Sequence, residues 1–466
     1  MSKKYTDQQI EITDILFPNK GTGIWEGNTV TVKNTLPGQT VLADVKKKRR
    51  QFEGRLKAVI KKADYEQEPA CPVFGSCGGC TYQNLSYEKQ LEIKQKTVKD
   101  LLDAANVQYG EFLPVKPSPI SEGYRNKMEF SFGDNGEGGE LCLGMRKRES
   151  FYEVVNADKC RIVHADVCRI LEATLEFFRS TDEQFYHKTR HTGTLRHLLV
   201  RRAYFTGEIS VNLVTTSGLK TELSAWAESL LALPLEGEIK GIAQIINDGV
   251  ADIVRADETK QLYGGEYFTE KLLGLEFKIS TFSFFQTNSA GAEVLYSTVR
   301  DFAGSGNDRI IFDLYCGTGT ITQIMSKSAK KVYGIEIVEE AVEAAKQNAK
   351  LNGIENCEFI AGDVLNMVDK LDDKPDLIIL DPPREGINPK AIKKIIGFGA
   401  PRLVYISCKA SSLSKDLLVF EENGYKTEKV QCVDMFPGTY HIETVVLLSR
   451  RKDEPRVQVT MTCKSD

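Results

Sequence analysis

The segment that decides the fold runs from Ile310 to Thr320 and reads IIFDLYCGTGT. Its first five residues are mostly apolar and predict a short buried strand, while Gly317 and Gly319 allow a tight turn into a following helix. Such a turn lets the backbone approach a bound ligand closely, as it does in the nucleotide sites of open α/β sheets. Because a glycine pair alone is weak evidence, the neighbouring strands have to support the assignment.

Three further predicted strands each end near an acidic side chain: residues 332–336 at Glu336, 358–360 before Asp363, and 377–380 before Asp381. Glu336 follows the glycines by about 20 residues, where a carboxylate can bind both hydroxyls of a ribose. Asp363 is placed to meet an adenine edge, and Asp381 begins the sequence Asp-Pro-Pro. A dinucleotide site favours a third glycine and does not call for Asp-Pro-Pro, so the pattern favours S-adenosylmethionine over NAD.

A fifth predicted strand, residues 403–406, runs into Cys408 and Lys409 at the same sheet edge. A thiol beside a cation can ionise near neutral pH, and a thiolate that adds to carbon 6 of a pyrimidine makes carbon 5 able to accept a methyl group. We expect Glu443, in a strand beside Cys408, to remove the proton from carbon 5, with His441 as the alternative base. Arg384 follows the two prolines where base N-methyltransferases carry an aromatic residue. A buried structural thiol is the alternative for Cys408.

Three cysteines lie within ten residues, in the sequence CPVFGSCGGC, as Cys71, Cys77 and Cys80. Cys160, between polar flanks, is the expected fourth ligand. A structural zinc site usually has two short cysteine pairs and this set has one, whereas an iron-sulfur cluster tolerates irregular spacing. We therefore expect a 4Fe-4S cluster, with zinc and a coincidental group of thiols as alternatives.

Two stretches carry the residue types that bind RNA. Residues 11–64 alternate apolar runs with Gly and Pro turns, which predicts a small β-barrel, and residues 46–62 hold nine Lys or Arg, Arg50 among them, against the single acid Glu53. The second stretch interleaves cations with Tyr186, Tyr204 and Phe205, and its basic side chains are His187, Lys188, Arg190, His191, Arg196, His197, Arg201 and Arg202. Cations and flat rings suit phosphates and unstacked bases. Solvated strand surfaces are the alternative for both.

The whole-chain composition limits the possible classes of protein. With 466 residues the chain is too long for one hydrophobic core. Its net charge of −4 means that the protein as a whole does not attract nucleic acid, so any binding of RNA must rest on local basic patches. Eleven cysteines without a signal peptide, and no apolar run of about 20 residues, argue against a secreted disulfide framework and a membrane protein. We expect a cytoplasmic multidomain protein: a barrel (1–65), a central α+β domain (66–280) whose helical excursion 86–115 packs on the last domain, and a Rossmann-like α/β domain (281–466).

Several motifs together resemble the RNA (uracil-5-)-methyltransferase family: the four cysteines, Tyr124-Arg125-Asn126-Lys127, Leu195-Arg196-His197, Phe284-Phe285-Gln286-Thr287-Asn288, Asp313–Gly317, Asp381–Arg384, Ser407-Cys408 and His441–Thr444. The resemblance covers nearly the whole chain and implies an N-terminal TRAM barrel and a class I methyltransferase domain. It implies that S-adenosylmethionine contacts Gln286, Tyr315, Thr320, Glu336, Asp363 and Asp381. It also implies Cys408 as the nucleophile, Glu443 as the proton acceptor and a 4Fe-4S cluster on the four cysteines.

One departure from the family's pattern is Lys409-Ala410, where many members have Asn-Pro. Members with both barrel and cluster mostly modify 23S ribosomal RNA, so the resemblance favours a monomeric 23S rRNA (uracil-5-)-methyltransferase. Transfer RNA as the substrate, cytosine-5 methylation, and an RNA-binding or RNA-folding protein without catalysis are the alternatives.

Overall fold

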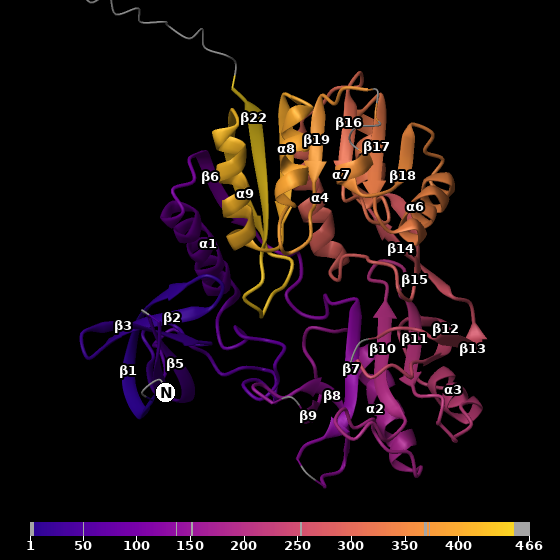
Figure 1. Cartoon of the computed structure of the whole chain (residues 1–466). Coiled ribbons are helices and arrows are strands. Elements are labelled where there is room, and N and C mark those ends of the chain that lie inside the picture. The colour runs from indigo at the N-terminus through magenta and orange to yellow at the C-terminus, as the bar shows by residue number, and fades with distance from the viewer. Residues whose placement is uncertain are drawn as a thin grey trace, which may run out of the picture.

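The computed structural model describes residues 4–451 apart from residues 50, 137, 151, 252, 253, 368–370 and 372. Three parts follow one another along the chain: a barrel, a central sheet and a C-terminal sheet (Figure 1). The expected fold class is confirmed for the N-terminal barrel and the C-terminal Rossmann-like sheet. Among the described helices, none is long and apolar enough to cross a membrane.

The barrel is closed by five strands in the order β1-β2-β3-β5-β4: β1 (Lys4–Leu16), β2 (Lys20–Trp25), β3 (Asn28–Lys33), β4 (Thr40–Lys48) and β5 (Gln51–Lys61). Alternate apolar side chains, such as Ile10, Ile12 and Val30, point inward and form its core. A Cβ at Gly23 would lie 2.1 Å from the carbonyl oxygen of Glu11, so only glycine fits there. The barrel is therefore fixed by its own strand pattern.

The central part is a seven-stranded sheet in the order β13-β12-β11-β10-β7-β8-β9. Its strands are β7 (Lys127–Asp134), β8 (Leu141–Arg146), β9 (Val154–Asn156), β10 (Leu195–Arg202), β11 (Glu208–Thr215), β12 (Glu238–Ile246) and β13 (Glu258–Gly264). Helices α2 (Ala165–Arg179) and α3 (Ser224–Leu231) share its core around Phe178 and Trp226. The hairpin β14 (Tyr267–Leu272) and β15 (Leu275–Ser280) leads to the C-terminal part.

The C-terminal part is an eight-stranded sheet in the order β18-β17-β16-β19-β20-β22-β21-β6. Its strands are β16 (Ile310–Leu314), β17 (Lys331–Glu336), β18 (Cys357–Ala361), β19 (Leu377–Leu380), β20 (Arg402–Ser407), β21 (Tyr425–Val433) and β22 (Glu443–Arg450), with β6 (Tyr109–Lys116) at the edge. The first five are parallel and β22 is antiparallel to both neighbours. The order reverses between β16 and β19, which is where such sheets bind ligands.

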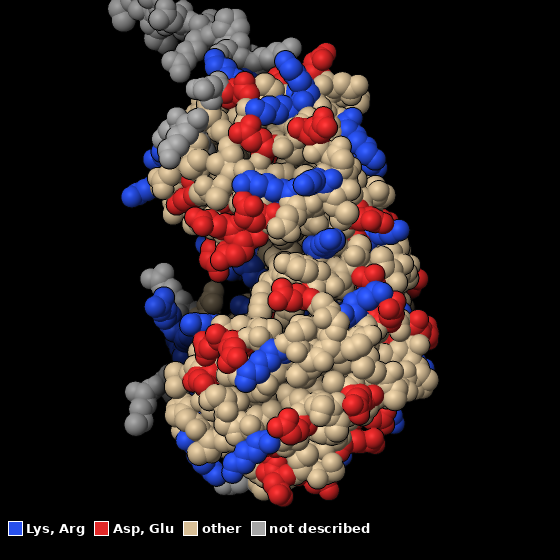
Figure 2. All heavy atoms as spheres, turned by 90° about the vertical axis from the view of Figure 1, so that its right-hand side faces the viewer, with Lys and Arg blue, Asp and Glu red and all other residues tan. Residues whose placement is uncertain are grey.

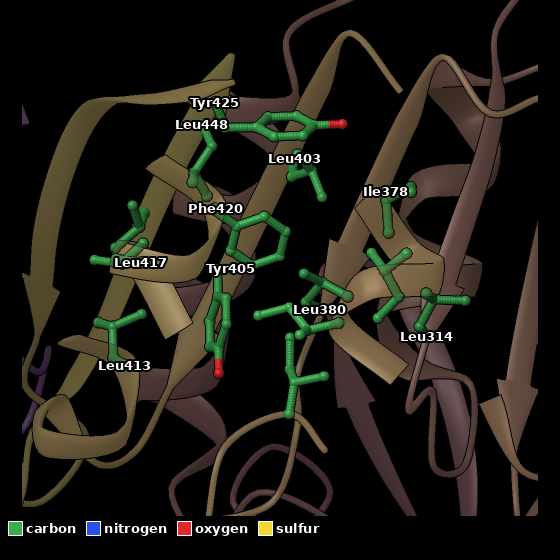
Figure 3. Close-up of a cluster of buried hydrophobic side chains, with 14 of the residues drawn as sticks. Leu314, Ile378, Leu380, Leu403, Tyr405, Leu413, Leu417, Phe420, Tyr425 and Leu448 are labelled. Atoms are coloured by element: carbon green, nitrogen blue, oxygen red, sulfur yellow. The ribbon is translucent and has the colours of Figure 1, made fainter. Parts of the chain in front are cut away.

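Helices cover both faces of this sheet and bury two separate cores. They are α4 (Ser289–Ala303), α5 (Thr320–Met325), α6 (Glu339–Leu351), α7 (Val364–Met367), α8 (Pro389–Gly397) and α9 (Ala410–Glu422). On one face Leu413, Leu417 and Phe420 of α9 pack on Leu403 and Tyr405 of β20 (Figure 3). Near-continuous apolar strands of this kind are typical of a sheet covered on both sides.

Residues 87–116 return from the N-terminal half to the C-terminal sheet. Helix α1 (Tyr87–Ala104), capped by Ser86, buries Val98 and Leu102 in the core shared with α9, and β6 pairs in parallel with β21 (Figure 1). This is the segment from which the sequence predicts a helical excursion. The boundaries predicted at residues 65 and 280 fall between β5 and α1 and at the end of β15.

Candidate active site

A cavity of about 1750 Å³ lies between the central and the C-terminal parts. Figure 2 shows the molecule hollowed between its upper and lower halves, with acidic side chains gathered on the upper lip. The residues predicted for the site that line this cavity are Cys408, Glu443, Gln286, Tyr315, Thr320, Glu336, Asp381, Cys71, Cys77, Cys80 and Cys160. Asp363 is exposed and is not part of the lining, although its charge acts on the hydroxyl of Tyr315. A small-molecule site usually measures about 300–1,000 Å³, so this cavity can take a cofactor together with part of a second substrate.

The glycine turn after β16 forms one wall. Tyr315 has φ 71°, a left-handed conformation that is uncommon for a side chain of this size and marks a constrained site. A Cβ at Gly319 would lie 2.5 Å from the ring of Phe359, so glycine is required for the close packing of α5. Glu336 accepts hydrogen bonds from the backbone N–H of Gly317 and of Val338, both at 3.0 Å. These bonds hold its carboxylate at the end of β17, facing the turn.

Two carboxyl groups, of the buried Asp313 and the half-buried Asp381, lie at the strand ends beside this turn. Burial raises the pKa of Asp313 to about 7, while the hydroxyl of Thr322, which donates to it at 2.5 Å, opposes the shift. Burial and the charge of Asp313 raise the pKa of Asp381 to about 7. A cationic ligand beside Asp381 would favour its ionised form and would itself be held by the carboxylate.

The thiol of Cys408 is half-buried at the end of β20. Burial, with contributions from the charges of Glu443 and Asp381, raises its pKa to about 11, and Arg384, which hydrogen-bonds the thiol, opposes this rise. The expectation of a thiol ionised by its sequence neighbour Lys409 is therefore wrong in two respects. The cation that acts on the sulfur is Arg384, and burial outweighs it.

Glu443 lies next to Cys408 because β20 and β22 pair with Ser407 opposite Thr444. Its side chain is 4% exposed, and burial, with the charge of Asp381, raises its pKa to about 8 against the effect of Arg384. His441 packs on the rings of Tyr440 and Phe436. Burial and nearby cations lower its pKa to about 4, so the imidazole is neutral at physiological pH.

Arg384 is a functional candidate to which the sequence reasoning gave no role. It lines the cavity and acts on Cys408, Glu443 and His441. Helix α9 holds its loop: the hydroxyl of Ser412 donates to the carbonyl of Arg384 at 2.6 Å, and a carboxylate oxygen of Asp416 accepts from the N–H of Ile387 at 2.9 Å. The signal in the sequence is its place directly after Asp-Pro-Pro at a strand end.

Lys409-Ala410, the departure from Asn-Pro, lies at the start of α9. Lys409 is the N-cap residue with extended backbone, φ −145° and ψ 95°, and it provides no side-chain cap. Asn at the N-cap and Pro at the first helical position favour the start of a helix. With Lys409-Ala410 in their place, α9 lacks a side-chain cap but still begins directly after Cys408 and Lys409.

The four cysteines line one end of the cavity and influence one another electrostatically. Burial and then the charge of Cys160 raise the pKa of Cys80 to about 12. The sulfur of Cys77 accepts from the N–H of Gly79 at 3.3 Å, and that of Cys80 from the amide of Gln83 at 3.2 Å. Within the described part of the chain, no three His, Cys, Asp or Glu side chains form a group that could hold a metal ion.

The expected RNA contacts in the second basic stretch are partly wrong. Arg196 is 3% exposed and donates to the carbonyls of Asn247, Gly249 and Ala251. Arg201 is equally buried and donates to Ser283, Arg202 pairs with the buried Asp166, and His197 is buried. These side chains hold loops inside the central part, which leaves the half-buried His187 and Lys188 and the exposed Arg190 and His191 as the candidates for RNA.

The basic run of the barrel is partly neutralised by acids. Arg55 pairs with Glu149 of the central part, and further pairs are Lys57 with Asp7, Lys62 with Glu68 and Lys48 with Glu53. Lys46, Lys47, Arg49 and Lys61 are exposed at the surface. Arg50 lies outside the described residues. The surface available to phosphates is therefore smaller than the count of basic residues suggests.

Comparison with known proteins places the chain in a family. The family model described as tRNA (Uracil-5-)-methyltransferase matches residues 86–451. The chain is 50% identical over 452 residues to an uncharacterized RNA methyltransferase of Clostridium acetobutylicum, covering 97% of this chain and 99% of that protein. A second one, from Clostridium tetani, is 49% identical with the same coverage.

Among solved structures, the tRNA (uracil-54, C5)-methyltransferase of Pyrococcus abyssi, in complex with S-adenosyl-L-homocysteine, is similar with a TM-score of 0.73 and 25% identity. The match covers 96% of this chain and 100% of that one. The range that the family model matches includes the glycine turn, the strand ends that carry Cys408 and Glu443, and Cys160, whereas Cys71, Cys77 and Cys80 lie before it. The chain belongs to the tRNA (uracil-5-)-methyltransferase family.

Proposed function

We propose that the protein transfers a methyl group from S-adenosylmethionine to carbon 5 of uridine in RNA. The observation that carries the proposal is the pairing of β20 with β22, which sets Cys408 beside Glu443 on the wall of a cavity that also holds the glycine turn and Asp381. Both reagents needed at a pyrimidine ring, a nucleophile for carbon 6 and a base for the proton on carbon 5, then face one space.

The donor would lie against the ends of β16, β17 and β19. Bound there, S-adenosylmethionine supplies a methyl group on a positively charged sulfur. Glu336 would bind the ribose, Asp381 would lie near the cationic end, and Gln286, Tyr315 and Thr320 would complete the lining. Asp363 lies outside the lining of the cavity, beside Tyr315 in electrostatic range, and would bind the adenine from that side.

Cys408 would begin the reaction by losing its proton to water in the cavity and bonding to carbon 6 of the uracil. The electron pair of the C5–C6 double bond moves into the ring carbonyl, and carbon 5 then forms its bond to the methyl carbon as the methyl–sulfur bond of the donor breaks. Glu443 in its ionised form takes the proton from carbon 5. The freed pair restores the double bond, and the C6–S bond breaks to return the thiolate of Cys408.

Arg384 supports the first step because its positive charge and hydrogen bond favour the thiolate over the thiol. Neutral His441 beside Glu443 can donate or accept a hydrogen bond at the ring without adding charge. To enter the cavity, the target base must leave its stack, so a loop or an opened helix is the expected substrate.

We propose 23S ribosomal RNA as the substrate, on the basis of the N-terminal barrel joined to a four-cysteine set. Transfer RNA is the second candidate, and one observation favours it. The Pyrococcus abyssi structure, named for uridine 54 of tRNA, aligns over 96% of this chain, so a barrel of this kind is not confined to enzymes of ribosomal RNA. We expect a monomer that acts in the cytoplasm.

We further propose that Cys71, Cys77, Cys80 and Cys160 hold a 4Fe-4S cluster. The donor set consists of four thiols at one end of one cavity, and two of the sulfurs accept hydrogen bonds, as cluster ligands commonly do. A cluster is several ångströms across, so its ligands need not converge as they would on a single ion. The cluster would organise the loop that carries it, since no electron is exchanged in methyl transfer.

The test is mass spectrometry of nucleosides from separated 23S ribosomal and transfer RNA, taken from cells with and without the gene. Loss of 5-methyluridine from ribosomal RNA is the expected result. Loss from transfer RNA alone would keep the reaction and replace the substrate.

In vitro, the wild-type protein should methylate the identified RNA and Cys408→Ala should not. Normal turnover by Cys408→Ala would contradict the proposed reaction.

A further inference from the structure

The segment from Asp434 to His441 joins β21 to β22 and lies directly before Glu443. Four consecutive carbonyl oxygens of this segment accept hydrogen bonds from residues far away in the sequence. The acceptors and donors are Met435 with Asn288 (3.0 Å), Phe436 with Lys94 (3.0 Å), Pro437 with the hydroxyl of Tyr124 (2.9 Å), and Gly438 with the N–H groups of Thr81 and Tyr82 (both 2.9 Å). Every donor comes from outside strands β16–β22.

The bonds that hold this segment are buried. Lys94 and Asp434 form an ion pair with Nζ to Oδ1 at 2.7 Å, and neither side chain is exposed. The side-chain oxygen of Gln90, also buried, accepts from the N–H of Gly438 at 2.7 Å. A buried ion pair contributes little net stability, because both charges lose their hydration. Its clearest effect here is to fix the position of the segment.

The segment contacts two different groups of the cavity. Its Gly438 accepts from Thr81 and Tyr82, which directly follow Cys80, and a Cβ at Gly438 would lie 3.9 Å from the sulfur of Cys80. In the next residue, the hydroxyl of Thr439 accepts from the N–H of His441 at 3.2 Å. The segment thus connects the cysteine loop with the residues proposed to act on the proton of carbon 5.

We propose that the segment Asp434–Gly438 positions His441 and Glu443, and that Tyr124, Gln90 and Lys94 are positioning residues for proton removal. The inference rests on the proposed function. Cys408 is held from another direction, by β20 and the start of α9. Loosening the segment should therefore slow the removal of the proton from carbon 5 without slowing the addition of the thiol to carbon 6.

The chain offers a matched pair of variants for the test. Tyr124 and Tyr425 are both buried, and each hydroxyl donates one hydrogen bond to a backbone carbonyl, of Pro437 at 2.9 Å and of Ala400 at 2.8 Å. Tyr124→Phe and Tyr425→Phe remove the same kind of bond, so a general loss of stability should be similar in both. Only the first bond belongs to the segment that leads to Glu443.

Two rates separate the steps. RNA with 5-fluorouridine traps the methylated covalent adduct, because no proton can leave carbon 5, and its rate of formation reports the attack by Cys408 and the methyl transfer but not the removal of the proton. Turnover on ordinary RNA includes proton removal. We expect Tyr124→Phe to lower turnover about tenfold and to accumulate adduct on ordinary RNA, with trapping within about twofold of wild type. We expect Tyr425→Phe to stay within about twofold in both rates.

Gln90 supplies a second comparison. Gln90→Leu removes the acceptor for the N–H of Gly438 (2.7 Å), together with the donor to the carbonyl of Leu85 (3.1 Å), and it should slow turnover in the same selective way. Equal loss of trapping and turnover in Tyr124→Phe, or equal behaviour of the two tyrosine variants, would overturn the inference. Failure of the wild-type protein to form any adduct or 5-methyluridine would instead overturn the proposed function.

Discussion

Cys408, Arg384 and Glu443 lie together in the site. The reaction needs Cys408 as a thiolate and Glu443 as a carboxylate, and burial disfavours both of these charged forms. Burial raises the pKa of the thiol to about 11 and that of Glu443 to about 8, so in the resting site both groups hold their protons at neutral pH. Arg384 opposes both shifts. In the resting site the thiol of Cys408 is therefore a weak nucleophile, and the interaction that favours its ionised form is the one with Arg384.

Removal of the cation at Arg384 tests its part in forming the thiolate. Arg384→Met should lower the rate of adduct formation with 5-fluorouridine RNA about 100-fold, because the developing negative charge on sulfur loses its hydrogen bond and its charge partner. Affinity for S-adenosylmethionine, measured by calorimetry, should remain, and Arg384→Lys should recover part of the rate. An unchanged rate in Arg384→Met would exclude this role.

The buried carboxyl of Glu443 also predicts a pH dependence of stability. Its pKa is raised to about 8 in the folded protein, above the ordinary value of 4.5, so the unfolded chain releases this proton first and the folded state loses stability as pH rises from about 4.5 to about 8. Glu443→Gln removes this loss. Its free energy of unfolding should exceed that of wild type by at least about 1 kcal/mol at pH 8 and match it at pH 4. Denaturant unfolding at both pH values checks this; equal stability at pH 8 would contradict it.

At the scale of elements, the strand ends could be predicted from the sequence and the loops between them could not. Ile310–Leu314 and Leu377–Leu380 are short apolar runs followed by Gly or Pro, so their order and polarity follow from local sequence. The contact of Arg384 with Cys408 depends on α9 holding the loop after β19 through Ser412, which no local pattern shows.

For the arginines of β10, the local sequence predicts the strand but not the burial of its side chains. In sequence, LRHLLVRR has the pattern of a polar strand surface and predicts a contact with RNA. The strand lies inside the seven-stranded sheet, where Arg196 reaches three carbonyls of one loop. The sequence alone does not distinguish a buried arginine that donates to carbonyl oxygens from an exposed arginine that binds phosphate. The distinction requires the positions of the neighbouring strands.

Helix α9 carries a prediction of its own at its N-terminus. Lys409 has extended backbone and no side-chain cap, which suits an asparagine. Lys409→Asn should therefore stabilise the protein by about 1 kcal/mol and leave methyl transfer close to wild type. Thermal unfolding and a turnover assay check both parts. Destabilisation by Lys409→Asn would mean that the start of α9 differs from the one described.

At the scale of the whole molecule, the cavity is an interface among parts that are separate in sequence. Its walls come from the cysteine loop, the central sheet, the β14–β15 hairpin and the ends of four parallel strands. The sequence motifs identified residues of the cysteine loop and of the strand ends, but not those of the central sheet or of the β14–β15 hairpin. The convergence of the cysteine loop and the methyl-transfer residues on one cavity depends on α1 and β6 packing back on the C-terminal sheet (Figure 1).

The proposed cluster predicts a defined result for the whole protein. Protein purified without oxygen should contain iron and sulfide, and Cys77→Ser should lose both together with turnover, while S-adenosylmethionine still binds. Cys142→Ser, at a buried thiol of β8 away from the set, is the matched control and should keep the metal. Zinc in the wild-type protein, or iron retained at full content in Cys77→Ser, would contradict the assignment.

In the proposed reaction, the methyl group reaches carbon 5 of uridine while Cys408 is bonded to carbon 6. The most direct measurement is mass spectrometry of peptides from wild-type protein incubated with S-adenosylmethionine and RNA that contains 5-fluorouridine. We predict one modified peptide, with a methylated 5-fluorouridine nucleotide attached at Cys408. Absence of any adduct, or its attachment at another residue, would contradict the account.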